Sequence, residues 1–267
     1  MKNFEDDQEY YGDWEYTTNS QLGYVKRSPA MYWKMRNGAK IDGAALRFGS
    51  LVHTMILEPE KVTSNFVVFN PENRPEQDKG MTSKINKEWK RSLDLSCKDG
   101  SKYLMTMEQY ELAQKLKRKL YDCPEVKNIL DNCETEVPKT WLDFNTMSKC
   151  KGKADIVIDG GDMLVDIKTT GKDVKDFKRS AYNFAYNRQA AFYLDGFNAK
   201  EFVFIVIESN APHQIGIFRC SEEFIESGRQ EYIELLENKK KYCETAEDAN
   251  NHIIHESYEK SNTKYLR

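Results

Sequence analysis

The sequence KADIVIDGGDMLVDIKTTG, residues 153–171, decides the fold of this chain. Two apolar, alternating stretches flank the sequence DGGD at 159–162, a pattern typical of two strands joined by a hairpin turn. Side chains repeat with a period of two along a strand, so Asp166 and Lys168 share one face. The hairpin brings Asp155 back beside them.

Two carboxylates and one ammonium group at the edge of an apolar sheet are costly to bury without partners. A divalent cation held by Asp155 and Asp166 would offset that cost, because hard cations take oxygen ligands. Lys168 would then be free to bind a water molecule or a phosphate. This is the chemistry of metal-assisted phosphodiester hydrolysis. The plain alternative is a solvated sheet face, and this stretch alone does not decide between the two.

The chain of 267 residues has 39% apolar and 31% charged residues, which is typical of one substantial globular domain. No apolar run approaches the ~20 residues of a membrane-spanning helix. The acidic, aromatic N-terminus lacks the pattern of a signal peptide. We therefore expect a cytoplasmic protein without a membrane partner.

The cysteines are scattered without a CxxC pair, which predicts free thiols in a reducing compartment rather than a zinc site. There are six of them: Cys97, Cys123, Cys133, Cys150, Cys220 and Cys243.

The formal net charge of −3 does not by itself indicate nucleic-acid binding, but the lysine and arginine residues are locally clustered. Clusters at 84–91 and 115–119 have glutamates close by and are interpreted as solvated faces. Clusters at 149–153 and 172–179 flank the hairpin, where we expect a phosphate backbone to lie.

The pattern along the chain predicts an acidic, poorly ordered leader at 1–20, one domain at 21–243 and a polar tail at 244–267. An α/β fold with a mixed central sheet flanked by helices follows from the order of the predicted elements. The helices are expected at about 29–37, 43–57, 82–92, 105–120, 124–130, 174–197 and 221–242. The strands are expected at 65–69, 134–142, 149–159, 163–168, 202–208 and 214–219.

Three further polar residues lie on predicted helices. His53 has apolar neighbours, so it is either a core residue or a metal ligand, and Gly49 one turn earlier leaves room on the same face. Gln189 and Tyr193 are spaced i, i+4 and share a face. Spacing alone does not distinguish a functional pair from the flank of an amphipathic helix.

The order of these segments resembles the PD-(D/E)xK nuclease superfamily and, more narrowly, the RecE-type exodeoxyribonucleases (exonuclease eight). The resemblance covers roughly residues 20–242. The segments that carry it are KRSPAMYW at 26–33, FGSLVHTMILEPE at 48–60, KAD at 153–155, DIKTT at 166–170 and RQAAFYLDGF at 188–197.

The resemblance implies a PD-(D/E)xK (restriction-endonuclease-like) core in which one site gathers His53, Asp155, Asp166 and Lys168. Gln189 and Tyr193 match the Q-x-x-x-Y motif of that family. Ala154 and Lys153 depart from the proline and arginine frequent there, but neither change removes a ligand. The iron–sulfur branch of the superfamily is excluded, because only Cys220 and Cys243 follow the DIK segment, too few for the C-terminal cysteine triplet of that branch.

The expected roles follow from this match. Asp155, Asp166 and the Ile167 carbonyl would hold Mg²⁺, with Mn²⁺ able to substitute, and His53 would contact a metal from the neighbouring helix. Lys168 would position and help deprotonate the attacking water. The Q-x-x-x-Y pair would hold the DNA strand or order the site.

The resemblance also implies 5′→3′ digestion of one strand of linear duplex DNA, leaving 3′ overhangs for recombination by strand annealing. It implies a phage or prophage origin, a ring-shaped homotetramer and a RecT-type single-strand annealing protein as partner. Two alternatives stay open from the sequence. One is a PD-(D/E)xK endonuclease that needs no DNA end, and the other is a non-catalytic DNA-binding recombination scaffold.

Overall fold

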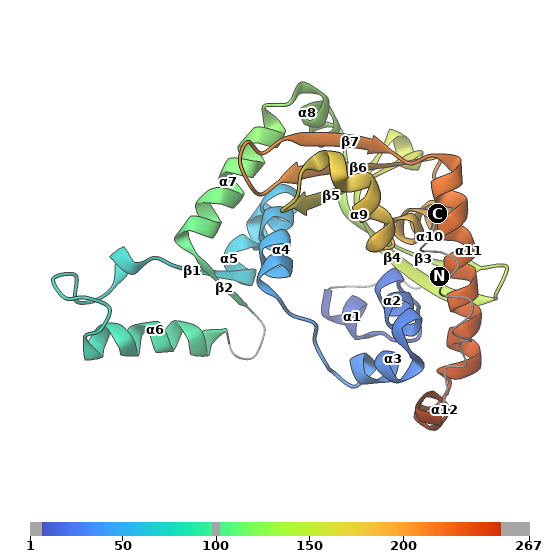
Figure 1. Cartoon of the computed structure of the whole chain (residues 1–267), viewed down its shortest axis with the longest axis horizontal. Coiled ribbons are helices and arrows are strands. Elements are labelled where there is room, and N and C mark those ends of the chain that lie inside the picture. Colours follow the sequence, from blue (N-terminus) through green and yellow to red (C-terminus); the bar gives the residue numbers. More distant parts are fainter. Residues whose placement is uncertain (1–6, 98–101, 252–267) are drawn as a thin grey trace, which may run out of the picture.

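A central five-stranded sheet carries the fold of the computed structural model, which describes residues 7–97 and 102–251 (Figure 1). The strands lie in the order β3 (Glu134–Asp143), β4 (Ser148–Ile158), β5 (Met163–Thr170), β6 (Glu201–Glu208) and β7 (Ile215–Arg219). The β5–β6 pair is parallel and the other pairs are antiparallel. The predicted mixed α/β sheet is therefore confirmed.

Helices cover both faces of this sheet. They are α1 (Asp7–Gly12), α2 (Asn19–Arg27), α3 (Pro29–Arg36), α4 (Ala44–Leu57), α5 (Val62–Asn65), α6 (Lys84–Ser96), α7 (Met107–Tyr121), α8 (Pro124–Asp131), α9 (Phe177–Asn183), α10 (Tyr186–Phe197), α11 (Glu222–Tyr242) and α12 (Ala246–Asn251). A short parallel pair, β1 (Phe66–Phe69) and β2 (Tyr103–Thr106), lies with α6 in an arm that extends away from the sheet (Figure 1). The sequence analysis did not foresee β2.

Strand β6 shows how the two cores are divided. Phe204 and its even-numbered neighbours pack with α2, α10 and α11, whereas Ile205 and its odd-numbered neighbours pack with α4 and α7. Both faces of β6 are buried, which is why its sequence is a continuous apolar run. Asp166 is paired with Phe204 in register, so Asp166 and Lys168 lie on the α10 face of β5.

The single helix predicted at 174–197 is wrong. The chain instead forms a 3-10 turn at Val174–Asp176, then α9, and then α10. The break comes at Ala185, whose φ of 54° lies in the left-handed region and cannot continue an α-helix. The apolar pattern is helical on both sides of this residue, so periodicity alone does not reveal the break.

The described part of the predicted leader is ordered, which corrects the expectation for residues 7–20. Thr17 forms a parallel bridge with Cys150 of β4. The buried ammonium of Lys151 donates hydrogen bonds to the carbonyls of Tyr10 and Asp13. Residues 1–6 lie outside the described part, as do residues 252–267 of the predicted tail. No helix in the described residues is long and apolar enough to cross a bilayer.

Candidate active site

Strand β5 places Asp166 and Lys168 together, as the period-two pattern predicts. The Lys168 ammonium lies 2.9 Å from Oδ1 and 2.7 Å from Oδ2 of Asp166. Asp166 is only 3% exposed, so its charge depends on partners within the protein. The hydrogen-bonded register of β4 with β5 ends at the pair Ile156–Val165, and the strands diverge beside these two charges.

Strand β4 changes its inward-facing side at Asp155. Cys150 and Ala154 belong to the core under α10 and α11, whereas Ile156 belongs to the opposite core. A strict period of two would put all three on one face, so the pattern shifts by one residue at Asp155. Glu136 lies opposite in the β3–β4 register, with a φ of 54°. Because of this irregularity, the Asp155 side chain points into the gap between β4 and β5.

His53 reaches Asp155 from α4. Its Nε2 atom lies 2.8 Å from Oδ2 of Asp155, and its Nδ1 atom lies 3.4 Å from Oε1 of Glu136. A Cβ atom at Gly49 would lie 3.4 Å from Oγ1 of Thr169 in β5, an ordinary van der Waals contact, so α4 packs directly on β5 there. The space that the sequence analysis noticed at Gly49 is thus taken by β5 itself.

Glu136 is the site residue that the sequence analysis missed. Its carboxylate lies 2.7 Å from the Lys153 ammonium and faces His53. The available signal was the register of the β3–β4 hairpin, which puts Glu136 opposite Asp155. Its left-handed backbone, uncommon for a residue with a side chain, marks a locally strained position.

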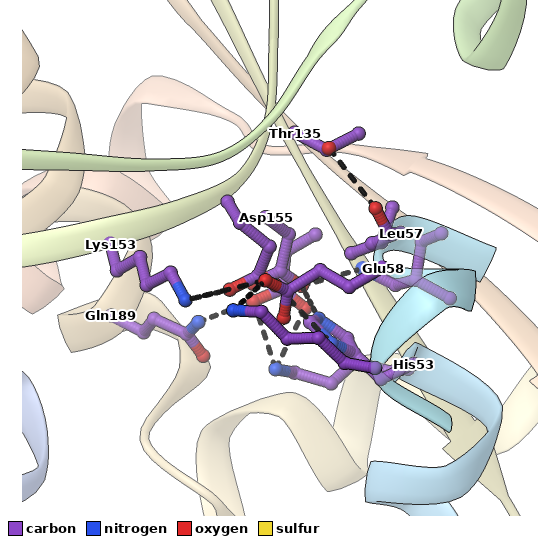
Figure 2. A network of polar contacts seen from close by, with 12 residues as sticks. His53, Leu57, Glu58, Thr135, Lys153, Asp155 and Gln189 are labelled. Atoms are coloured by element: carbon purple, nitrogen blue, oxygen red, sulfur yellow. Dashed lines mark hydrogen bonds and ion pairs between the residues drawn. The ribbon is translucent and has the colours of Figure 1, made fainter. Parts of the chain in front are cut away.

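Helix α10 contributes Gln189 and Tyr193. The Gln189 amide donates a hydrogen bond to Oδ1 of Asp166, which ties α10 to β5. Figure 2 shows the side chains of Gln189, Lys153 and His53 converging around Asp155. Tyr193 lies at the margin, where its ring packs on the Cα of Gly152 and stacks on Phe197 with centroids 6.1 Å apart.

Tyr186, at the start of α10, was not predicted as a site residue. The Lys168 ammonium lies 5.0 Å from the centre of its ring, within the range of a cation–π contact. Its signal in the sequence was weak, because an aromatic residue on an apolar helix is usually a core residue.

The neighbouring charges of the cluster shift the pKa values of its members. Burial disfavours the imidazolium of His53, but the neighbouring carboxylates, Asp155 foremost, outweigh burial and raise its pKa to about 9. Burial raises the pKa of Asp166 to about 6, with help from the charge of Asp155 and against the pull of Lys168. Burial also opposes the charge of Lys168, yet the two aspartates raise the pKa of its ammonium overall.

The donor set fits a divalent cation. His53, Glu136 and Asp155 each offer one ligand atom, and these atoms lie within 4.8 Å of one another. Oδ2 of Asp166 is buried and accepts no well-oriented hydrogen bond, although the Lys168 ammonium is in ion-pair contact with it. Carboxylate oxygens with one imidazole suit Mg²⁺ or Mn²⁺.

The Ile167 backbone also faces this place. Its N–H donates to Oδ2 of Asp155 over 3.3 Å. The N–H and C=O of one strand residue leave the strand on the same side, so the Ile167 carbonyl points towards β4 as well. Its predicted role as a metal ligand stays a prediction.

The two basic clusters that flank the hairpin differ in their exposure and partners. Lys149 pairs with Glu15, Lys151 is buried against the N-terminal segment, and Lys153 pairs with Glu136. Lys151 and Lys153 are therefore held within the protein, and a phosphate contact by the exposed Lys149 stays a prediction. The four cations of 172–179 are exposed, and within the described part of the chain none of their side chains forms an ion pair.

A mixed sheet embraced by helices, with Asp155, Asp166 and Lys168 at a strand divergence, defines a domain of the PD-(D/E)xK class. The chain belongs to the family described as a PDDEXK-like domain of unknown function (DUF3799), whose model matches residues 18–252. The predicted superfamily is confirmed, and the narrower RecE-type assignment stays a prediction.

A solved structure shows the same fold. A candidate exonuclease from Eubacterium rectale is 15% identical, with a TM-score of 0.57 over 100% of both chains. A phage-related exonuclease from Haemophilus somnus 129PT is 13% identical and covers 76% of this chain and 94% of its own. Its TM-score of 0.33 is too low to support an argument. No curated protein matches the sequence.

Proposed function

We propose that this protein is a divalent-metal-dependent DNA nuclease, and more narrowly a Mg²⁺-dependent 5′→3′ exonuclease that acts on the ends of linear duplex DNA. The observation that carries the proposal is the convergence of Asp155, Asp166 and Lys168 at the point where β4 and β5 diverge. A scaffold that only binds DNA would gain nothing from holding these buried charges together.

The metal would be held by Asp155, Asp166 and His53, with Glu136 beside them and the Ile167 carbonyl completing the set. When bound, the cation would supply a Lewis acid for the scissile phosphate and a lower pKa for a water ligand. Among the described residues, Lys153, Lys168 and His53 offset the charge of these carboxylates. The bound cation would add positive charge at the point where the phosphate arrives.

Lys168 supplies the positive charge next to the reacting phosphate. Its raised pKa keeps it an ammonium group in the metal-free protein, so it serves as a hydrogen-bond donor that orients the attacking water. The same charge would stabilise the pentavalent phosphate, which carries more negative charge than the substrate. Gln189 holds the Asp166 carboxylate in place through its amide. Tyr193 would order the site from its margin.

The preference for an end over an internal site rests on two supports. The sequence resembles the RecE-type exonucleases, and the Eubacterium rectale structure with the same fold is named as a candidate exonuclease. A ring-shaped homotetramer and a RecT-type annealing partner are proposed on the resemblance alone. Sedimentation velocity of the purified protein tests the first of these two proposals.

Digestion of linear and covalently closed circular duplex DNA tests the main proposal. With Mg²⁺, the linear duplex should be degraded and the closed circle spared, and a chelator should stop the reaction. A 5′ label should be released early, while a 3′ label should stay on a long single strand. Nicking of the circle would show an endonuclease, and early loss of the 3′ label would reverse the polarity. Purified Lys168→Ala protein serves as the control for contaminating nucleases.

A further inference from the structure

Two large aromatic rings are exposed at the junction of α9 and α10. Phe184 is 64% exposed and Tyr182 is 55% exposed. Ala185, in the left-handed region, follows directly and ends the helical path of α9. Tyr182 packs edge-on against Phe224 of α11, with ring centroids 5.0 Å apart, and residues two apart on a helix do not share a face. Phe184 is therefore an apolar feature of its own, which the packing of the two cores does not require.

Phe184 connects to the candidate active site through Tyr186. The ring centroids of Phe184 and Tyr186 are 5.7 Å apart, with an interplanar angle of 35°. The Lys168 ammonium in turn lies over the ring of Tyr186. The contacts from Lys168 to Tyr186 and from Tyr186 to Phe184 thus join the candidate active site to a ring that is exposed to solvent.

A segment with net positive charge leads into this junction, while Glu222 and Glu223 begin α11, whose Phe224 contacts Tyr182. The segment at 172–179 carries four exposed cations and two aspartates, an excess of two positive charges. The Asp173 carboxylate accepts a hydrogen bond from the Lys175 backbone N–H, so part of the negative charge is directed at the chain itself. Lys178 lies one helical turn before Tyr182 and shares its face of α9.

We propose that Phe184 forms a platform on which a base of a single DNA strand stacks while the backbone of that strand enters the active site. The inference rests on the proposed nuclease function and names the form of DNA that the site receives. Every base has a π-face, so such a platform is tolerant of sequence, and nearby cations hold the phosphates. A second protein copy is disfavoured as the occupant, because covering the ring would also bury these cations.

Binding of two fluorescein-labelled single strands to the full chain tests the platform. One strand is oligothymidylate and the other is an abasic oligomer of equal length, and both are titrated in EDTA so that nothing is cleaved. Wild-type protein should bind oligothymidylate more tightly than the abasic strand. Phe184→Ala should lose roughly five- to a hundred-fold in affinity for oligothymidylate, the range of one lost base stack, and little for the abasic strand.

Matched variants keep this test specific. Phe144→Ala removes a ring that is 82% exposed in the β3–β4 turn, at the far end of β3 from Glu136, and should leave both affinities unchanged. Phe184→Trp should retain the preference for bases. Lys178→Gln should weaken binding of both strands alike and reduce the dependence on salt, because a phosphate contact carries no information about bases.

Three results would overturn the platform: equal wild-type affinity for the two strands, an unchanged preference in Phe184→Ala, or equal losses for both strands in that variant. A change in sedimentation coefficient in place of the base preference would make Phe184 part of a protein interface. Hydrolysis of the abasic strand in Mg²⁺ separates this inference from the nuclease proposal. Phe184→Ala should cleave it as wild type does, and wild-type protein that cleaves no DNA yet prefers bases would refute only the nuclease.

Discussion

Oδ2 of Asp155 lies 2.8 Å from Nε2 of His53 and accepts the backbone N–H of Ile167 at 3.3 Å. One carboxylate oxygen therefore joins α4, β4 and β5 at the point where the two strands separate. Helix α4 is far in the sequence from the β4–β5 hairpin, so the geometry of the candidate site depends on how α4 packs on the sheet. The predictions below test that geometry.

Replacement of Lys168 by Ala should lower the rate of hydrolysis by about 10²- to 10³-fold or more, because the group that stabilises the developing phosphate charge is lost. Lys115→Ala, at an exposed lysine of the 115–119 cluster, should retain most of the activity. Rates on end-labelled linear duplex and melting temperatures are measured on the same preparations. A Lys168→Ala protein with near-wild-type cleavage would sink the assignment of this site.

Asp166→Asn should also abolish hydrolysis, yet the metal-free variant should melt at the same temperature as wild type or higher. The buried Asp166 carboxylate faces the like charge of Asp155, and functional sites of this kind often cost stability. Thermal unfolding in EDTA measures the effect. A large loss of stability would mean that Asp166 serves the fold rather than the metal.

His53→Ala should lose activity steeply and regain part of it at higher metal concentration or with Mn²⁺, which accepts nitrogen ligands more readily than Mg²⁺. If His53 served packing alone, the variant would instead lose about 1–3 kcal/mol of unfolding free energy, and activity would follow the folded fraction. Metal-dependent rates and melting temperatures, measured together, distinguish the two.

Glu136→Gln should weaken Mg²⁺ binding about 10- to 100-fold, the usual cost of losing a group that supports a metal site. The variant also removes the ion pair with Lys153. Glu134→Gln, at an exposed glutamate of the same strand, is the matched control. Isothermal titration with Mg²⁺ measures both, and equal affinities would leave Glu136 with a structural role only.

The metal-free protein should lose stability as the pH rises from 6 to 10. The folded pKa of His53, about 9, lies above its ordinary value of 6.5, so its interaction with Asp155 stabilises the fold fully below pH 6.5 and is lost as the pH passes 9. This contribution is at most about 3 kcal/mol. Unfolding in EDTA across this range should show the decline in wild type and a flatter profile in His53→Gln.

Gly228→Ala tests the packing that positions α10. A Cβ atom at Gly228 in α11 would lie 2.0 Å from the Asn187 carbonyl oxygen, a clash with backbone that no rotamer relieves. We expect a loss of about 1–3 kcal/mol or more. Gly43→Ala meets no atom within 4 Å and should be well tolerated. Chemical denaturation of the two variants measures the difference, and equal stabilities would contradict the close approach of α10 and α11.

The hairpin of β4 and β5, and the placing of Asp166 and Lys168 on one face, could be predicted from the sequence. Strand periodicity and turn residues are local properties, and a residue's face follows from its number along the strand. The apolar stripe of α4 and the buried run of β6 were readable for the same reason. The resemblance, carried by short motifs in a fixed order, added the superfamily.

Which charged side chains contact one another follows from the packing of the folded chain. Glu136 reaches His53 because its backbone takes a left-handed conformation opposite Asp155. No feature of the neighbouring sequence predicts that conformation. Lys151 looked like a DNA contact in the sequence, but the N-terminal segment covers it. The partner of a long charged side chain depends on the packing of segments distant in sequence, which short-range periodicity does not encode.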